Sequence, residues 1–498
     1  MGEPMVETPS DPTIGNRALS HGKWIVSAPI VAKAVGLVAT MVLARLLAPA
    51  QFGVMAFAGT AVAFVAVFQD LGITQALISH PGDIRERLRP ALVLSAGSAL
   101  VFYLTLAALA YPLAAFVGEP LLGPVLLVFG SVVVLQTFGQ VQHALLVRGE
   151  RYRALFFVTL AQALAYVGVA VGLASAGFGV WSLVFGHVAA QLVRTLSLWM
   201  LSTWRPFGRG ARGKLWSAGL VRFGGALTLV NVLDWAADGW VFLSIGKLLG
   251  SESLGLYNLS FEAARMAYFG LPALAASVVL TSYSSLLDDP VELRRLMLKG
   301  LRVVHGLAFP IAACIAALAP WIVPLVWGSK WDGAVPLLTV MALLGFSAPL
   351  GNVLLPYFVS SGKLRFLVWL TAIRLVLYAI VITAAAGFGV RAVALAHLLL
   401  MWAVAATILF MAARSIAATA SDLRAALLWP ALRAAAGGLA AGAVARGLDG
   451  LHPALVLGPA LAAGAAVYAA VWITTDREGF FETASVVARG TGVLRDAR

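Results

Sequence analysis

Long apolar segments alternate with short polar connections along almost the whole chain. A run of roughly 18 or more apolar residues with few charges is long enough to cross a bilayer as a helix. The pattern therefore predicts an all-α polytopic membrane protein with about fourteen transmembrane helices. We place these helices at residues 22–47, 52–78, 90–116, 121–147, 153–176, 179–203, 216–247, 254–286, 299–327, 333–360, 364–387, 389–413, 424–446 and 452–474.

The chain carries one phrase twice, and each copy joins one predicted helix to the next. "AGFGVWSLVFGH" begins at Ala176 and "AGFGVRAVALAH" begins at Ala386. "ARLLAPAQFGV" and "GKLLGSESLGL" form a second pair, in which Gly53 matches Gly255, and "RGERYRALF" and "SGKLRFLVW" form a third. Gly-Phe-Gly is by itself a common turn. Three matches in register nevertheless favour two copies of a six-helix unit, related by an axis along the membrane normal.

This repeat predicts the domain organisation, with a pseudo-twofold pair of six-helix lobes and two additional C-terminal helices. No connection exceeds about 20 residues, so the chain has no room for a folded domain outside the membrane. We predict a cytoplasmic N-terminal segment at 1–21, an N-lobe at 22–204, a cytoplasmic linker at 205–215, a C-lobe at 216–413, the two last helices at 414–474 and a cytoplasmic tail at 475–498.

Composition and charge agree with a membrane protein. The chain is 61% hydrophobic and 11% charged, whereas soluble domains are about half apolar and about a quarter charged. Its net charge of +13 would suggest a nucleic-acid partner in a soluble protein. Cytoplasmic loops of membrane proteins collect Lys and Arg, however, so the excess has another explanation. We expect no nucleic-acid partner.

The positive charges also predict the orientation. They are dense in alternate connections, at 85–89, 148–153 and 205–214. The opposite connections contain only Arg45, Lys247, Lys330, Arg391 and Arg446. The positive-inside rule then predicts that both termini are cytoplasmic. Residues 1–20 lack the apolar core of a signal peptide, so we expect the first helix to direct insertion.

Enzyme signatures are missing from the sequence. The single cysteine, Cys314, cannot form an internal disulfide. No Walker loop, no metal-spaced Cys/His cluster and no Gly-x-Ser-x-Gly motif occurs. We therefore predict no catalytic residue, no metal site and no cofactor, and we expect a transporter.

Charged side chains within the predicted helices are the candidate functional residues, since each costs roughly 2.5–3.5 kcal/mol at mid-bilayer. Asp234 and Asp238 are one turn apart and share a helix face with Asn231, so they share a proton, bind a cation or face a basic partner. Glu262 and Arg265 are three residues apart and could neutralise each other. The alternative is that these charges only fasten helices together. The other titratable residues near mid-depth are Lys33, Arg194, Arg374, His187 and His397.

Three stretches resemble a known family. These are "LARLLAPAQFGVMAFAGTAVAFVAVFQDLGITQALISHPGD", "DGWVFLSIGKLLGSESLGLYNLSFEAARM" and "LTSYSSLLDDPVELRRLMLKGLRVVHGLAFPIAAC". They are similar to the Wzx-type polysaccharide flippases of the multidrug/oligosaccharidyl-lipid/polysaccharide exporter superfamily, and the similarity extends over most of residues 15–415. The resemblance implies two six-helix lobes in the bacterial plasma (inner) membrane. It also implies translocation of a polyprenyl-diphosphate-linked oligosaccharide from the cytoplasmic to the outer leaflet. Polysaccharide polymerases or glycosyltransferases are the partners to expect.

Such a substrate gives the charged residues candidate roles, which we assign from their depth and chemistry. The cations Lys33, Arg194, Arg265 and Arg374 would bind the diphosphate. Coupling to H⁺ or Na⁺ would fall to Asn231, Asp234, Asp238 and Glu262, and His187 and His397 are candidates for lining a cavity. Two other functions stay open, namely a drug/cation antiporter of the same superfamily and a membrane-embedded glycan polymerase or ligase. The latter usually presents a sizeable outer loop, which this chain lacks.

Overall fold

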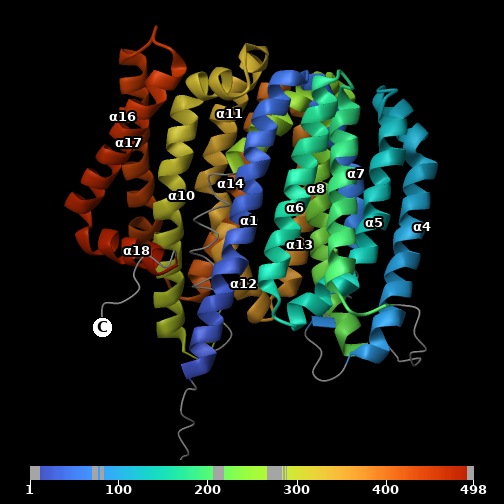
Figure 1. Cartoon of the computed structure of the whole chain (residues 1–498). Helices are drawn as coiled ribbons and strands as arrows, with labels where there is room; N and C mark the ends of the chain where they lie inside the picture. The colour runs from blue at the N-terminus through green and yellow to red at the C-terminus, as the bar shows by residue number, and fades with distance from the viewer. Residues whose placement is uncertain are drawn as a thin grey trace, which may run out of the picture. The chain divides into compact units, whose positions relative to one another are not determined.

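A computed structural model describes residues 12–69, 74, 77–78, 84–205, 218–265, 283, 286–287 and 289–490. Within these ranges all regular structure is helical, and eleven helices are long and apolar enough to cross a membrane (Figure 1). The predicted all-α polytopic fold is confirmed. Three predicted spans, at 52–78, 216–247 and 254–286, are not among the eleven. Parts of all three, and most of the predicted linker at 205–215, lie outside the described residues.

The chain divides into two compact units. Unit 1 comprises Met1–Leu46, Ala61–Leu113 and Leu121–Gly224, and unit 2 comprises Leu47–Thr60, Ala114–Pro120 and Gly225–Arg498. Two short segments from the first half of the sequence therefore pack within unit 2. The division into lobes at 22–204 and 216–413 stays a prediction.

Unit 1 is built on four helices that pack pairwise, with α6 against α1 and α7, and α5 against α7. A small core joins α4 to α5 through Leu88, Ala91 and Val141. The helices with residues in this unit are α1 (Pro12–Leu46), α2 (Pro49–Gln69), α4 (Arg85–Val117), α5 (Leu122–Arg148), α6 (Tyr152–Ser175) and α7 (Val180–Leu201).

Unit 2 is organised around the long helix α10, which contacts α11, α12, α16 and α17. Asp289 caps this helix by accepting from the backbone N–H groups of Val291 and Glu292, and Pro290 occupies the first turn, where no N–H is needed. The helices are α8 (Ala218–Arg265), α10 (Pro290–Val326), α11 (Val335–Ala342), α12 (Ala348–Ser360), α13 (Leu364–Ala386), α14 (Val390–Ser415), α15 (Ala420–Leu423), α16 (Trp429–Gly447), α17 (Pro453–Thr475) and α18 (Arg477–Gly490).

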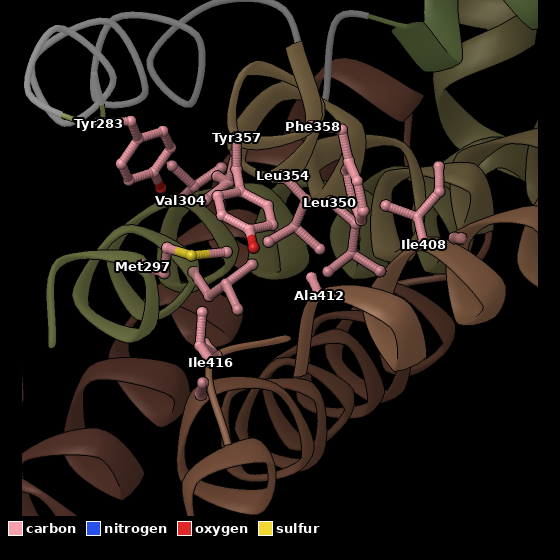
Figure 2. Close-up of a cluster of buried hydrophobic side chains, with 14 of the residues drawn as sticks. Tyr283, Met297, Val304, Leu350, Leu354, Tyr357, Phe358, Ile408, Ala412 and Ile416 are labelled. Atoms are coloured by element: carbon pink, nitrogen blue, oxygen red, sulfur yellow. The ribbon is translucent and has the colours of Figure 1, made fainter. Parts of the chain in front are cut away.

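One apolar core of unit 2 lies where α10, α12 and α14 meet (Figure 2). Met297 of α10, Leu354 and Phe358 of α12 and Ile408 of α14 all point into it. Because lipid tails are as apolar as these side chains, close van der Waals packing holds the three helices together here. This core fixes α14, which carries His397.

Helix α8 consists of two helical segments that meet at a sharp kink at Gly250, whose φ of 85° favours glycine, so the predicted boundary between the helices 216–247 and 254–286 lies where expected. Two other details depart from the simple pattern of continuous spans. The predicted helix 333–360 breaks at the 3₁₀ turn Leu343–Phe346, just before Pro349. The predicted tail at 475–498 contains a further helix, α18.

Both copies of the duplicated phrase form a turn between two helices, although Gly177 has a φ of 83° and its counterpart Gly387 a φ of −60°. Gly179 precedes α7 and Gly389 precedes α14, with φ values of 58° and 93°. His187 and His397 then follow at the same distance into α7 and α14. Each predicted turn therefore ends one helix and begins the next as expected. Superposition of the two six-helix copies stays a prediction.

A second repeated pair meets in space. A Cβ on Gly53 of α2 would lie 1.8 Å from the carbonyl oxygen of Ser251, and a Cβ on Gly255 of α8 would lie 1.9 Å from that of Pro49. In the aligned repeat Pro49 matches Ser251, so equivalent residues make reciprocal contacts. A twofold relation between two surfaces produces such reciprocity. We call this the glycine contact (Gly53, Gly255, Pro49 and Ser251).

Candidate functional site

Three charged residues from two helices of unit 2 form one cluster. The Arg374 Nη2 group, on α13, donates to Asp238 Oδ1 on α8 at 3.0 Å and lies 3.4 Å from Asp234 Oδ1. It also donates to the backbone oxygen of Asp234 at 2.9 Å. We call this set the Asp–Arg cluster (Asp234, Asp238 and Arg374). Because the two aspartates are one turn apart, one guanidinium reaches both.

The sequence left open whether the two aspartates share a proton, bind a cation or face a basic partner. In the structure they face a basic partner, Arg374. Arg374 was assigned to the substrate and the aspartates to ion coupling, and the structure brings both groups together. Trp240 of α8 donates to Thr383 of α13 at 3.0 Å, which holds the two helices in this register.

Exposure within the cluster is uneven. The Arg374 side chain is 11% exposed, whereas Asp234 and Asp238 are 42% and 54% exposed. A buried guanidinium needs partners for its donors, yet Arg374 Nε has none among the described residues. The cluster therefore holds a buried cation between two accessible carboxylates and leaves one of its donors unused.

The aromatic ring of Tyr378 covers the guanidinium. Arg374 Cζ lies 5.4 Å from the centre of this ring, within the range of a cation–π contact. Sequence reasoning missed Tyr378. The available signal was its spacing, four residues after Arg374 on the same helix face.

His397 lies next to this ring and is itself enclosed. It is 3% exposed, its Nδ1 hydrogen-bonds with the hydroxyl of Tyr257, and its ring meets Tyr378 edge-on at 5.4 Å. Phe261 covers another side at 5.6 Å. The residue proposed for a cavity thus lies among aromatic rings and links α8, α13 and α14.

The Glu262–Arg265 pair lies at the end of α8. Arg265 Nη1 is 2.8 Å from Glu262 Oε1, with both side chains substantially exposed, so these residues neutralise each other as the spacing suggested. Arg265 also lies close enough to Asp238 to interact with it electrostatically. Three carboxylates thus face two guanidinium groups in this part of unit 2.

The other candidate residues lie in unit 1, apart from one on α8. Arg194 on α7 donates to Gln162 Oε1 on α6 at 3.4 Å. His187 Nδ1 is 2.8 Å from the Leu183 oxygen, and its ring packs edge-on against Tyr166 at 4.6 Å. Lys33 on α1 is exposed. Asn231 belongs to α8, but its side chain is outside what the structure describes.

Comparisons with known proteins place the chain in a family. The model of the family described as polysaccharide biosynthesis protein matches residues 42–336. The chain is 26% identical over 381 residues to the succinoglycan biosynthesis transport protein ExoT of Rhizobium meliloti (strain 1021), covering 76% of each chain. It is 25% identical over 354 residues to the lipopolysaccharide biosynthesis protein WzxC of Escherichia coli (strain K12), covering 68% of this chain and 69% of WzxC.

A solved structure shows the same fold. The lipid II flippase MurJ, in an inward closed conformation, matches with a TM-score of 0.66 over 94% of this chain and 99% of that one, at 13% identity. Fold, size and helix content therefore agree with the match by sequence. The chain is a member of the polysaccharide biosynthesis protein family.

Proposed function

We propose that this protein is a flippase that moves a polyprenyl-diphosphate-linked oligosaccharide from the cytoplasmic to the outer leaflet for cell-surface polysaccharide assembly. Family membership, relatives named for polysaccharide and lipopolysaccharide biosynthesis, and a fold shared with a lipid II flippase support this function. The structural observation that carries it is Arg374. This guanidinium is kept inside the helices by carboxylates that an anionic substrate can replace.

In the proposed mechanism the diphosphate competes with the aspartates for Arg374. A guanidinium binds phosphate oxygens through two parallel N–H donors, and its unused Nε–H provides one of them. Asp234 and Asp238 then lose their partner, and carboxylates without a cation are stabilised by taking up a proton or Na⁺. Substrate loading and ion uptake are thereby linked at the same residues during alternating access.

The remaining candidates extend this arrangement. Glu262 would release Arg265 as the aspartates release Arg374, and Asn231 would supply a further oxygen to a coupling ion. Lys33 and Arg194 would also bind the diphosphate. His187 and His397 would contribute to the cavity for the sugars, which for His397 requires Tyr257 or Tyr378 to move.

We also propose the location and the partners. The protein would lie in a bacterial plasma (inner) membrane with both termini in the cytoplasm, as the distribution of Lys and Arg favours. Glycosyltransferases would supply the lipid-linked unit on the cytoplasmic side, and a polysaccharide polymerase would consume it on the other.

One observation favours a second function, a drug/cation antiporter. The three carboxylates Asp234, Asp238 and Glu262 outnumber the two nearby guanidinium groups, and they are accessible, so a cation could bind there. A membrane-embedded glycan polymerase or ligase has no comparable support, since no described residue presents a catalytic constellation outside the helices.

A transport assay separates these functions. Purified protein in liposomes is given either a fluorescent polyprenyl-diphosphate oligosaccharide or a cationic dye. We expect translocation of the lipid-linked sugar and none of the dye. Arg391→Gln, which removes an exposed cation outside the cluster, serves as the control and should leave transport unchanged. Dye transport without movement of the lipid-linked sugar would overturn the proposal in favour of the antiporter.

A further inference from the structure

A separate group of polar side chains is buried between α10, α16 and α17 of unit 2. Arg433 of α16 is 4% exposed, its Nη1 lies 3.7 Å from Asp476 Oδ2, and its guanidinium stacks over the Trp472 ring at 5.8 Å. Arg302 of α10 is close enough to act on Arg433 electrostatically. We call this set the Arg433 cluster (Arg302, Arg433, Trp472 and Asp476).

The charges of the side chains that the structure describes in this cluster do not balance. Two guanidinium groups face one described carboxylate, and the contact from Arg433 to that carboxylate is long. The other oxygen of Asp476 is occupied, because it accepts from the backbone N–H of Gly479 at 3.0 Å where α18 begins. Burying a cation without full compensation is costly, so the described side chains of the cluster lack an anion.

The same cluster contains several buried hydrogen-bonding groups without partners among the described residues. They are Arg302 Nε, Arg433 Nε and Trp472 Nε1. On α18, which packs against α17 and α10, the buried Thr483 Oγ1 likewise has no partner among the described residues. The three nitrogen groups can only donate, so their complement is an acceptor. Trp472 cannot simply turn away, since its ring packs against Gly306 of α10, 2.6 Å from where a Cβ would lie. Excess positive charge and unused donors both point to an oxyanion.

The position of the cluster indicates where the anion comes from. Helix α17 ends at Thr475, Asp476 follows, and α18 packs against α17 and α10 (Figure 1). Helix α18 is amphipathic, and Phe481 is 54% exposed under the guanidinium of Arg477. An amphipathic helix with basic and aromatic residues directly after the last span is typical of one lying at the membrane interface. Lipid phosphates are the abundant anions at that level.

We propose that the Arg433 cluster binds the phosphate of a lipid headgroup at the membrane face where α17 ends. Arg433 and Arg302 would supply paired N–H donors to the phosphate oxygens, and Trp472 and Thr483 would add one donor each. Asp476 and Thr483 belong to the segment that contains α18, so this helix would close over the headgroup. The site is distinct from the Asp–Arg cluster and does not rest on the proposed function.

The test uses the full chain in dodecyl maltoside, a detergent without phosphate. Phosphatidylglycerol, polyprenyl phosphate or inorganic phosphate is added, and native mass spectrometry and the unfolding temperature report binding. We expect a lipid phosphate to be retained and to raise the unfolding temperature. Trp472→Phe and Thr483→Val each remove one donor, so each should weaken binding about tenfold. Without lipid, Thr483→Val should be as stable as the parent, because it keeps the shape and removes only an unused donor. Trp472→Phe should be less stable even without lipid, because part of the ring that packs against Gly306 is lost, and its stability loss should be larger with lipid.

Two further variants complete the design. Arg433→Gln should abolish retention of the lipid, whereas Arg295→Gln, the same loss of charge at a side chain 78% exposed on α10, should change nothing. If Arg433→Gln does not fold, Trp472→Phe and Thr483→Val carry the test. Three results would overturn the proposal. These are equal binding by parent and variants, a stability loss of these two variants that is the same with and without lipid, and binding of inorganic phosphate only.

Discussion

At the scale of single residues, Arg374 is the member of the Asp–Arg cluster whose substitution should have the largest effect. It is nearly buried, it serves two carboxylates with one nitrogen, and its charge is covered by a tyrosine ring. Removing it leaves two carboxylates one turn apart with their common partner gone. Removing one aspartate still leaves the guanidinium paired. Substitution of Arg374 should therefore have a larger effect than substitution of either aspartate.

Arg374→Gln is expected to abolish transport and to lower the free energy of unfolding by about 1–3 kcal/mol. The range lies below that for a fully buried pair, because both aspartates are half-exposed. In the triple variant with Asp234→Asn and Asp238→Asn, the stability should return but transport should not. Unfolding in detergent and the liposome assay measure the two effects. A triple variant that transports normally would show that the cluster only fastens helices.

Asp238→Asn is expected to change the ion dependence of transport more than the affinity for substrate. This aspartate makes the 3.0 Å contact to Arg374, and an amide can take up neither a proton nor the charge of Na⁺. Transport measured across a series of pH values and Na⁺ concentrations should become flat, with the half-saturating substrate concentration nearly unchanged. Glu292→Gln, at an exposed pair on α10, is the control. An unchanged ion dependence with weaker substrate binding would contradict the coupling role.

At the scale of helices, the glycine contact brings the start of α2 against α8 directly after its kink. Side chains normally keep two helices 8–10 Å apart. Here each glycine faces a backbone oxygen of the other helix, so the two main chains are in direct contact. Gly250 supplies the turn that directs the second part of α8 into this position.

Gly53→Ala and Gly255→Ala should each destabilise the protein by about 1–3 kcal/mol or more, since the new methyl group would overlap a carbonyl group. Gly59→Ala is the matched control, because it lies on α2 with nothing within 4 Å of the added Cβ. It should be neutral or stabilising by up to about 1 kcal/mol. Thermal unfolding of the three variants in one detergent gives the comparison. Equal unfolding temperatures for all three would mean that the helices are farther apart than described.

At the scale of the whole molecule, the predicted topology is the main expectation to check. Phe178 and Phe388 stand at the tips of the two repeated turns, 53% and 85% exposed. An even number of spans between those turns would place both on the same side of the membrane. The basic connection at 205–214 would face the other side.

Single cysteines in a Cys314→Ser background test this orientation. Phe178→Cys and Phe388→Cys should react with an impermeant maleimide added to intact cells, whereas Gly210→Cys should react only after the membrane is opened. Labelling of residue 210 from outside would refute the topology. Labelling of only one of the two phenylalanine positions would refute the repeat.

Sequence patterns predicted the helices well because long apolar runs have few alternatives in a bilayer. The spacing of Asp234 and Asp238 also predicted that they act together. It could not predict Arg374 as their partner, since the two helices are 136 residues apart in sequence and no period connects them. The break of the helix at Leu343–Phe346 could not be predicted either, because a broken and a continuous apolar helix have the same composition. Helix α18 was missed because its mixed composition is that of a solvated tail.

The glycine contact has a consequence for how the chain tolerates mutation. A side chain that collides with another side chain can be accommodated by shortening its neighbour, so second-site suppressors arise at the facing position. At Gly53 and Gly255 the obstacle is a main-chain oxygen, which every residue type carries. No substitution at Ser251 or Pro49 makes room. The sequences of the two halves of the chain can therefore diverge around this point. Each half must nevertheless retain its own glycine.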